Sequence, residues 1–218
     1  MRYLKKILYL IVLIGYSFSY AGSYEAFFEA LARDDVRTVQ PLLQRGFDPN
    51  SVDPTGQNAL LLALQKSSWA VAQLLIAQPS TQVEVRTRND ESSLMLAALK
   101  GQLEICRQLI ARQADVNKPG WTPLHYAASS GNPALVQLLL DHYAYVDAES
   151  PNASTPLMMA AMYGSSAAVK VLLDAGADPT LKNALGLGAL EFAQKAGHPE
   201  AMQFIAQALR ARQPAGSW

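Results

Sequence analysis

The twelve residues WTPLHYAASSGN, Trp121–Asn132, join a Thr-Pro pair to an apolar segment, two alanines and a glycine. A second version of this pattern, STPLMMAAMYGS, occupies Ser154–Ser165, so that Thr122-Pro123 is repeated as Thr155-Pro156. A fixed period of roughly 20–50 residues indicates a repeat protein. The stretch is therefore interpreted as one copy of a unit that recurs along the chain.

Six copies can be aligned on the leucine that follows the Thr-Pro pair. The spacing between successive copies is nearly constant, except that the interval from Leu94 to Leu124 is three residues short, which predicts a stunted connecting loop. The second junction, residues 78–86, has an irregular composition. The aligned positions are Phe27, Leu60, Leu94, Leu124, Leu157 and Leu190, and the predicted repeats cover 22–52, 53–86, 87–117, 118–149, 150–182 and 183–212.

Each copy predicts a pair of helices. Pro123 and Pro156 stand at a first helical position, where the missing N–H is not needed. In the first copy Glu25 is a weaker candidate cap, and Pro41 falls inside the second helix, where proline is expected to kink it. The other five copies place a good N-capping residue before the first helix, namely Asn58, Ser92, Thr122, Thr155 and Gly188.

This pattern resembles the ankyrin repeat family. The match is carried by Thr122-Pro123-Leu124-His125, by Thr155-Pro156-Leu157, by the alanine pairs and by Gly176-Ala177-Asp178-Pro179. The resemblance implies an all-α ankyrin-repeat solenoid of about six helix-turn-helix repeats with short finger loops. It also implies one domain over residues 22–212, and a structural, hydrogen-bonded role for His125.

The resemblance further implies that the fingers and first helices form a concave face that binds another protein. Trp121, Met162 and Tyr163 add aromatic and adaptable side chains of the kind found at interface hot spots. The alternative is that Trp121 only covers the adjoining finger. The candidate partner-binding residues are Arg88, Asn89, Glu91, Lys100, Trp121, Ser129, Ser130, Met162 and Tyr163.

Composition and motifs predict no chemistry. The formal net charge is zero, and no basic stripe indicates a nucleic-acid partner. Phosphate-binding glycine loops, HExxH and CxxC are absent from the sequence. Cys106 is the only cysteine and is interpreted as a buried, inert thiol. We therefore expect a monomeric protein that is not an enzyme and holds no cofactor or metal.

The N-terminal segment 1–21 predicts a secretory signal. Arg2, Lys5 and Lys6 precede the apolar run Ile7–Ile14, and Ala21 ends a small-residue cleavage pattern. The alternative is an uncleaved anchor, although spanning a bilayer takes roughly 20 apolar residues. After cleavage no stable membrane insertion is expected, and residues 213–218 are expected to form a flexible tail.

Together these features predict an exported, non-catalytic protein-binding module in the periplasm or outside the cell. The alternative is an inhibitor or immunity protein that blocks a secreted toxin or enzyme. The two hypotheses share the fold and the binding face and differ in the partner.

Overall fold

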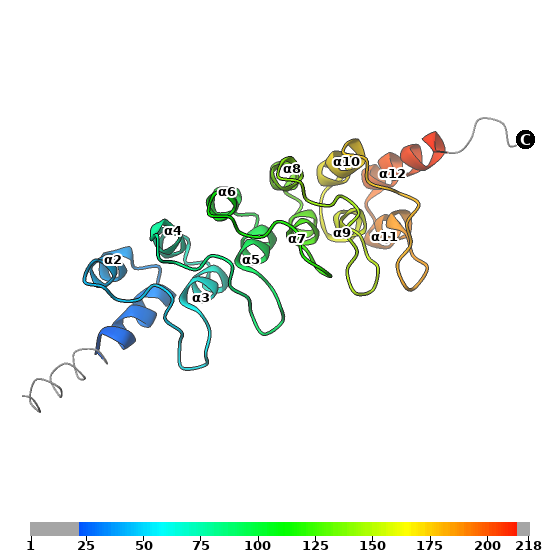
Figure 1. The fold of residues 1–218 in the computed structure, drawn as a ribbon. Coiled ribbons are helices and arrows are strands. Elements are labelled where there is room, and N and C mark those ends of the chain that lie inside the picture. Colours follow the sequence, from blue (N-terminus) through cyan, green and yellow to red (C-terminus); the bar gives the residue numbers. More distant parts are fainter. Residues whose placement is uncertain (1–21, 213–218) are drawn as a thin grey trace, which may run out of the picture. The chain divides into compact units, whose positions relative to one another are not determined.

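The computed structural model describes residues 22–212, so the predicted signal segment and the predicted tail lie outside the described residues. Apart from isolated bridges, the regular structure within that range is helical, and the helices come in pairs, two to each predicted repeat (Figure 1). The first pair is a helix over residues 22–32 and α2 (Val36–Gln44). The others are α3 (Ala59–Lys66) and α4 (Trp69–Ala77), α5 (Ser93–Leu99) and α6 (Leu103–Ala111), α7 (Pro123–Ser130) and α8 (Pro133–Asp141), α9 (Pro156–Tyr163) and α10 (Ser166–Asp174), and α11 (Ala189–Ala196) and α12 (Pro199–Ala211).

The chain divides into two compact units, Met1–Gln82 and Val83–Trp218. The first contains the helices up to α4, and the second contains α5 to α12. The division falls inside the junction over residues 78–86, whose irregular composition had set it apart in the sequence.

Two layers of helices build the second unit. The first helices of the repeats, α5, α7, α9 and α11, pack one against the next, and each also packs on its own second helix, α6, α8, α10 or α12 (Figure 1). The second helices pack in the same succession. Alanine pairs such as Ala127-Ala128 and Ala160-Ala161 are completely buried between the first helices, and their small side chains allow neighbouring backbones to approach closely.

The helix starts follow the capping prediction. Asn58, Ser92, Thr122, Thr155 and Gly188 are the N-cap residues of α3, α5, α7, α9 and α11. The expectation for Glu25 is wrong, because this residue lies inside the helix over 22–32. In the same repeat, α2 continues through Pro41, whose carbonyl accepts bonds from Arg45 N (3.2 Å) and Nε (3.1 Å).

A side-chain cap replaces the histidine of TPLH in three other repeats. Met95 Sδ accepts from Ser92 N, and Met158 Sδ accepts from Thr155 N, each at 3.4 Å. In the last repeat Glu191 Oε2 accepts from Gly188 N at 2.9 Å. The N-cap amide, which needs a partner when buried, thus keeps one although the residue type changes.

In the first unit, the turn of the first repeat caps a helix of the second repeat. Asp34 takes a left-handed conformation (φ 56°), and its carboxylate accepts the N–H groups of Ala70 and Val71 at 3.2 and 2.8 Å. These are among the free amides at the start of α4, where a negative charge is stabilising. Phe27 and Phe47 stack at 4.4 Å between ring centroids inside this first repeat.

Ser93 offers a stabilising substitution. Its side chain is fully buried, and its hydroxyl has no hydrogen-bond partner within the described structure. Its backbone N–H faces the preceding finger, which the bridge between Arg86 and Ser92 brings alongside, so alanine, which keeps this donor, is the appropriate replacement. We expect Ser93→Ala to raise the free energy of unfolding by about 1 kcal/mol, because it removes the unsatisfied hydroxyl. Urea denaturation followed by circular dichroism measures this, and a loss of stability in the variant would contradict it.

None of the helices within residues 22–212 combines the length and the apolar character that crossing a bilayer requires.

Candidate functional site

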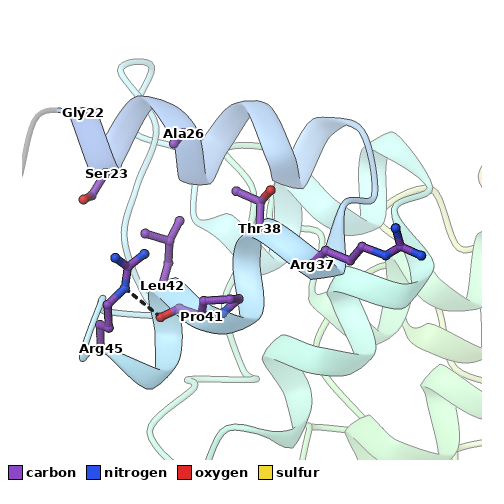
Figure 2. A pocket seen from close by; sticks show the side chains of 8 residues that line it. All are labelled: Gly22, Ser23, Ala26, Arg37, Thr38, Pro41, Leu42 and Arg45. Atoms are coloured by element: carbon purple, nitrogen blue, oxygen red, sulfur yellow. Dashed lines mark hydrogen bonds between the residues drawn. The ribbon is translucent and has the colours of Figure 1, made fainter.

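Two pockets are candidate sites. The first lies at the N-terminal end of the first unit (Figure 2). It has a volume of about 420 Å³. Two of its polar side chains are already used locally, because Thr38 Oγ1 donates to Asp35 at 2.6 Å and Arg45 Nε donates to the carbonyl of Pro41. The lining residues are Gly22, Ser23, Ala26, Arg37, Thr38, Pro41, Leu42 and Arg45. No convergent set of ligand-binding groups faces this space.

The second pocket, here named the Trp121 pocket, lies in the second unit and has a volume of about 220 Å³. It is formed by the first helices of three successive repeats and by the finger residue that precedes α7. Met159 and His125 are buried beneath it, whereas Leu99 is 44% exposed on its edge. The lining residues are Leu99, Trp121, His125, Tyr126, Ser129 and Met159. Apart from one serine hydroxyl, one phenol and one imidazole, the lining side chains are hydrophobic.

The short third finger, which carries Trp121, is closed by a lysine side chain and not by a backbone hydrogen bond. The neighbouring fingers close with a backbone bond, Thr87 N to Glu91 O (2.9 Å) in one and Ser150 N to Ser154 O (3.0 Å) in the other. Residues 118–122 form no backbone bond of this kind in the described structure. Instead Lys118 Nζ donates to the carbonyls of Pro119 (3.0 Å) and Trp121 (3.2 Å).

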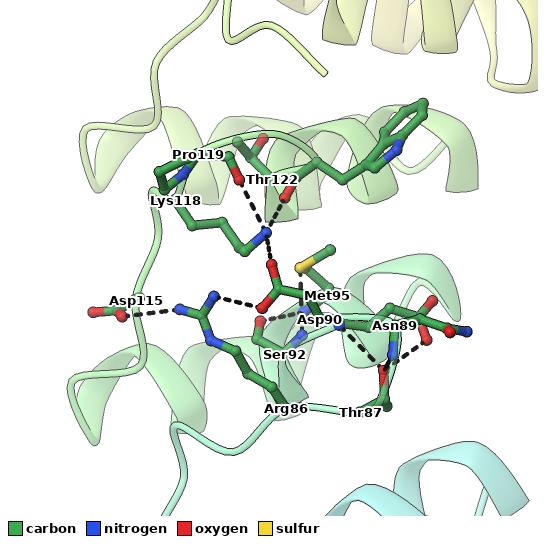
Figure 3. Close-up of polar contacts among 12 residues, drawn as sticks. Arg86, Thr87, Asn89, Asp90, Ser92, Met95, Asp115, Lys118, Pro119 and Thr122 are labelled. Carbon is green, nitrogen blue, oxygen red and sulfur yellow. Dashed lines mark hydrogen bonds and ion pairs between the residues drawn. The ribbon is translucent and has the colours of Figure 1, made fainter. Parts of the chain in front are cut away.

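Lys118 also joins the short finger to the preceding one. Its ammonium lies 2.6 Å from the Asp90 carboxylate, and only 6% of the Lys118 side chain is exposed. Arg86 contacts the same carboxylate at 3.0 Å and also reaches Asp115 (Figure 3). A further ion pair joins Arg86 to Glu84. Hydrogen bonds from Lys118 and Arg86 lower the pKa of Asp90, and the bond to Asp90 raises the pKa of Arg86. In this short finger, ion pairs among Arg86, Asp90 and Lys118 thus take the place of the backbone hydrogen bond that closes the neighbouring fingers.

Tyr126 connects the pocket to a second carboxylate of the preceding finger. Tyr126 Oη donates to Glu91 Oε1 at 3.1 Å, and Thr87 Oγ1 donates to Glu91 Oε2 at 3.2 Å. Burial, together with the charge and the hydrogen bond of Glu91, raises the pKa of Tyr126 to about 12. The phenol therefore stays protonated and keeps donating to the carboxylate at any physiological pH.

His125 forms the polar support under the pocket. It is 1% exposed, and its ring lies edge-on to Trp121 with 5.2 Å between centroids. Nε2 bonds to the carbonyl of Ser154 at 2.9 Å, and Nδ1 faces Thr122 N at 3.2 Å and Thr122 Oγ1 at 2.9 Å. These bonds show that His125 has a structural role, because they link its own repeat to the next finger.

The candidate binding residues of the sequence analysis are distributed unevenly around this pocket. Trp121 and Ser129 line it, and Glu91 bonds to its tyrosine. Lys100 caps the C-terminus of α5 next to Leu99. The remaining members are Arg88 and Asn89, exposed on the finger before α5; Ser130, whose hydroxyl donates to Ala127 O; and Met162 and Tyr163 at the end of α9, outside the lining.

Sequence reasoning did not select Tyr126 and Met159. Both lie on first helices at the same repeat position, because Tyr126 is two residues after the aligned Leu124 and Met159 is two residues after the aligned Leu157. Tyr126 stands four residues after the N-cap Thr122 and so lies one turn above it, which places it beside the finger. That register, compared across copies, is the signal that could have identified it.

No catalytic or metal-binding arrangement is found in residues 22–212. No three His, Cys, Asp or Glu side chains gather there in a metal-binding group. Burial raises the pKa of the Cys106 thiol to about 12, which keeps it in the unreactive protonated form.

Comparisons with known proteins agree with this architecture. The family model for ankyrin repeats (three copies) matches residues 27–119, 67–150, 94–183 and 146–213. The chain is similar to the B-cell lymphoma 3 protein homolog of Mus musculus, with 34% identity over 152 residues, covering 66% of this chain and 34% of that protein. The transient receptor potential cation channel subfamily A member 1 of Homo sapiens is 29% identical over 175 residues, covering 75% of this chain and 16% of the channel. The chain therefore spans about a third or less of these curated relatives.

Two solved structures are similar over nearly their whole length. An ankyrin repeat domain from Acinetobacter baumannii AYE matches with a TM-score of 0.70 and 27% identity, over 83% of this chain and 95% of that one. A chain in the complex of the Bd0816 predatory endopeptidase from Bdellovibrio bacteriovorus with immunity protein Bd3460 matches with a TM-score of 0.71 and 25% identity, over 84% and 97%. Since the family model covers nearly all of the described residues, this chain belongs to the ankyrin repeat family.

Proposed function

We propose that this protein is an exported, non-catalytic module that binds one partner protein through the finger and first-helix surface around the Trp121 pocket. Ankyrin repeats are protein–protein interaction modules. The observation that carries the assignment of the surface is the Trp121 pocket itself. The aromatic side chain of Trp121 lines an open apolar hollow of about 220 Å³, and Lys118 holds the backbone carbonyl of this residue.

The size of the pocket favours a protein partner over a small molecule. Small-molecule sites typically measure about 300–1,000 Å³, whereas this hollow suits a single inserted side chain. Rigid helices and a tethered finger form its wall, so little conformational entropy is lost when a partner docks. Tyr163, 63% exposed at the end of α9, extends the same surface.

Export to the periplasm or the cell exterior is part of the proposal and rests on the basic and apolar pattern of the N-terminal segment 1–21. Sequencing the N-terminus of protein recovered from outside the cytoplasm tests it. A mature chain beginning at Gly22 is expected, and a chain retained in the cytoplasm with Met1 in place would contradict it.

Replacing Trp121 and Tyr163 together by alanine is expected to abolish partner capture. Tyr163 is 63% exposed and Trp121 is partly exposed beside the pocket, and such aromatic residues dominate interface energies. Crosslinking in intact cells, followed by identification of the captured protein, gives the readout. The matched control is the pair Tyr143→Ala and Tyr145→Ala, which removes two exposed aromatics (86% and 69%) from the loop after α8. Capture by the first double variant at the native level, with normal melting, would reject this surface.

A second candidate function is favoured by one comparison. A chain of the same fold occurs in the complex of an endopeptidase with an immunity protein. We therefore propose, as the alternative, that the partner is a secreted toxin or enzyme that this protein blocks. If so, the partner captured in the crosslinking experiment is an enzyme, and adding the purified protein lowers its activity.

A further inference from the structure

We propose that the Trp121 pocket receives a lysine or arginine side chain of the partner, with the cationic end on Glu91 and the aliphatic stem against Trp121 and Tyr126. This inference rests on the proposed function, since it specifies the partner chemistry of the same surface. Three independent features of the second unit carry it: the state of the Glu91 charge, the make-up of the pocket wall, and the charge of the surrounding fingers.

The Glu91 carboxylate lies next to the pocket, because it accepts the hydroxyl of Tyr126, one of the lining residues. Within the described part of the chain, its two oxygens accept hydrogen bonds from the uncharged hydroxyls of Tyr126 and Thr87 and from no other group. Glu91 forms no ion pair with any residue between 22 and 212. A carboxylate offers about four acceptor positions, so a cation can still be bound.

The adjacent carboxylate shows the opposite arrangement. Asp90 is neutralised by Lys118 at 2.6 Å and by Arg86 at 3.0 Å (Figure 3). These two bases are thereby committed to the finger cluster. Of two successive acidic residues, one stabilises the short finger and the other keeps its charge beside an apolar hollow.

The wall of the pocket suits the remainder of a long basic side chain. Lysine and arginine bury their methylene stems on apolar surface while the charged end stays hydrogen-bonded, and Leu99 and Met159 provide such surface. The aromatic rings of Trp121 and Tyr126 add favourable cation–π contacts when a cation lies within about 6 Å of the ring centre. A purely apolar residue would fill the hollow but leave Glu91 without a counter-charge.

The charges of the three nearest fingers favour a basic partner at longer range. Lys100, the nearest base on α5, sits at the C-terminal end of this helix, whereas Glu91 precedes its N-cap. Net negative charge on a binding surface raises the rate of encounter with a positive partner. Residues 83–91, 115–121 and 147–153 contain three basic residues, Arg86, Arg88 and Lys118, against six acidic ones, Glu84, Asp90, Glu91, Asp115, Asp147 and Glu149.

The test is selection of a displayed random peptide library on the full-length protein, run in parallel on Glu91→Gln and Glu91→Lys. Wild-type protein is expected to select peptides that share one lysine or arginine. Glu91→Gln should lose that preference while keeping the shape of the side chain, and Glu91→Lys should shift it toward aspartate or glutamate. Glu104→Gln on α6, an exposed residue whose carboxylate bonds only to Gln108 within its own helix, is the matched control and should select the wild-type peptides.

The best peptide then gives the magnitude. Replacing its basic residue by norleucine keeps the stem and removes the charge, and is expected to weaken binding about tenfold in fluorescence anisotropy. On Glu91→Gln the same replacement should change the affinity by less than about twofold, because the charge partner is already gone.

Two outcomes would overturn the inference, and they are distinguishable. If the selected peptides depend on Trp121 but share no basic residue, or if Glu91→Gln selects the same basic residue, the cation assignment is wrong and the binding surface stands. If no selected peptide loses affinity when Trp121 is replaced by alanine, both the cation assignment and the proposed surface are wrong.

Discussion

Replacing Gly164 by alanine is expected to lower the free energy of unfolding by about 3 kcal/mol. A Cβ atom built at this position lies 2.3 Å from Ala128 O and 2.9 Å from both Cα and O of Ala160. All three are backbone atoms, so no side chain can rotate away to relieve the clash. One of these atoms belongs to Ala128 of α7, the other two belong to Ala160 of α9 itself, and the backbone of Gly164 (φ −89°, ψ −142°) lies outside the main regions open to alanine. The cost therefore combines strain at the end of α9 with separation of α7 from α9.

Urea denaturation followed by far-ultraviolet circular dichroism measures the effect. Gly176→Ala is the matched control, because a Cβ atom there meets nothing within 4 Å while the backbone is left-handed (φ +93°). The control should lose only about 1 kcal/mol, the conformational penalty of a non-glycine residue in that region. If Gly164→Ala were no less stable than Gly176→Ala, close packing of α7 on α9 would not contribute the expected stability.

Gly164 illustrates what the repeat pattern can and cannot predict. Its period and its place after a first helix follow from the alignment, as do the five helix caps and the all-helical fold. The reason for the glycine does not, because Gly131 and Gly197 take left-handed conformations as helix-ending glycines do, whereas Gly164 does not. Here glycine is required by its own ψ of −142°, by the close approach of Ala160 and by the carbonyl of Ala128 in the neighbouring repeat, and a single copy of the pattern does not reveal that last contact.

In the candidate site too, the sequence predicts some features and leaves others to the structure. Trp121 was singled out because an aromatic residue at a finger end is typical of an interface, and Glu91 because fingers line the expected face. The bond between Glu91 and Tyr126 joins residues 35 apart, and the role of Lys118 depends on carbonyls that only a folded finger turns inward. Such contacts cross from one copy to the next, so their chemistry is set by pairs of copies and is not visible in either copy alone.

The short third finger links stability to the proposed recognition. Removing three residues would leave the segment before α7 without the backbone bond that closes its neighbours. Lys118 compensates by donating to the carbonyls of Pro119 and Trp121 and by pairing with Asp90. Lys118 thus holds the backbone of Trp121 next to the pocket and neutralises Asp90. Glu91 is then the acidic group of this finger that is left to pair with a cation from the partner.

The stability of this protein is expected to fall by about 3 kcal/mol more between pH 6.5 and pH 4 than that of the His125→Met variant. Burial lowers the pKa of His125 from 6.5 to about 4 and outweighs the hydrogen bonds to Ser154 and Ala148, which raise it. The unfolded chain therefore binds a proton through this window that the folded chain does not. Stability from His125 is fully present above pH 6.5 and is lost as the pH falls toward 4.

Methionine is the appropriate replacement because Met95 and Met158 already cap the equivalent amides in two other repeats. Denaturation midpoints measured at intervals from pH 7 to pH 4 give the two curves, and subtracting them removes the contribution of every carboxylate and of His142 and His198, which both proteins share. The difference should be flat above pH 6.5 and steepen below it. Parallel curves down to pH 4 would mean that His125 accepts a proton in the folded state as easily as in the unfolded chain, and that its burial does not keep it neutral.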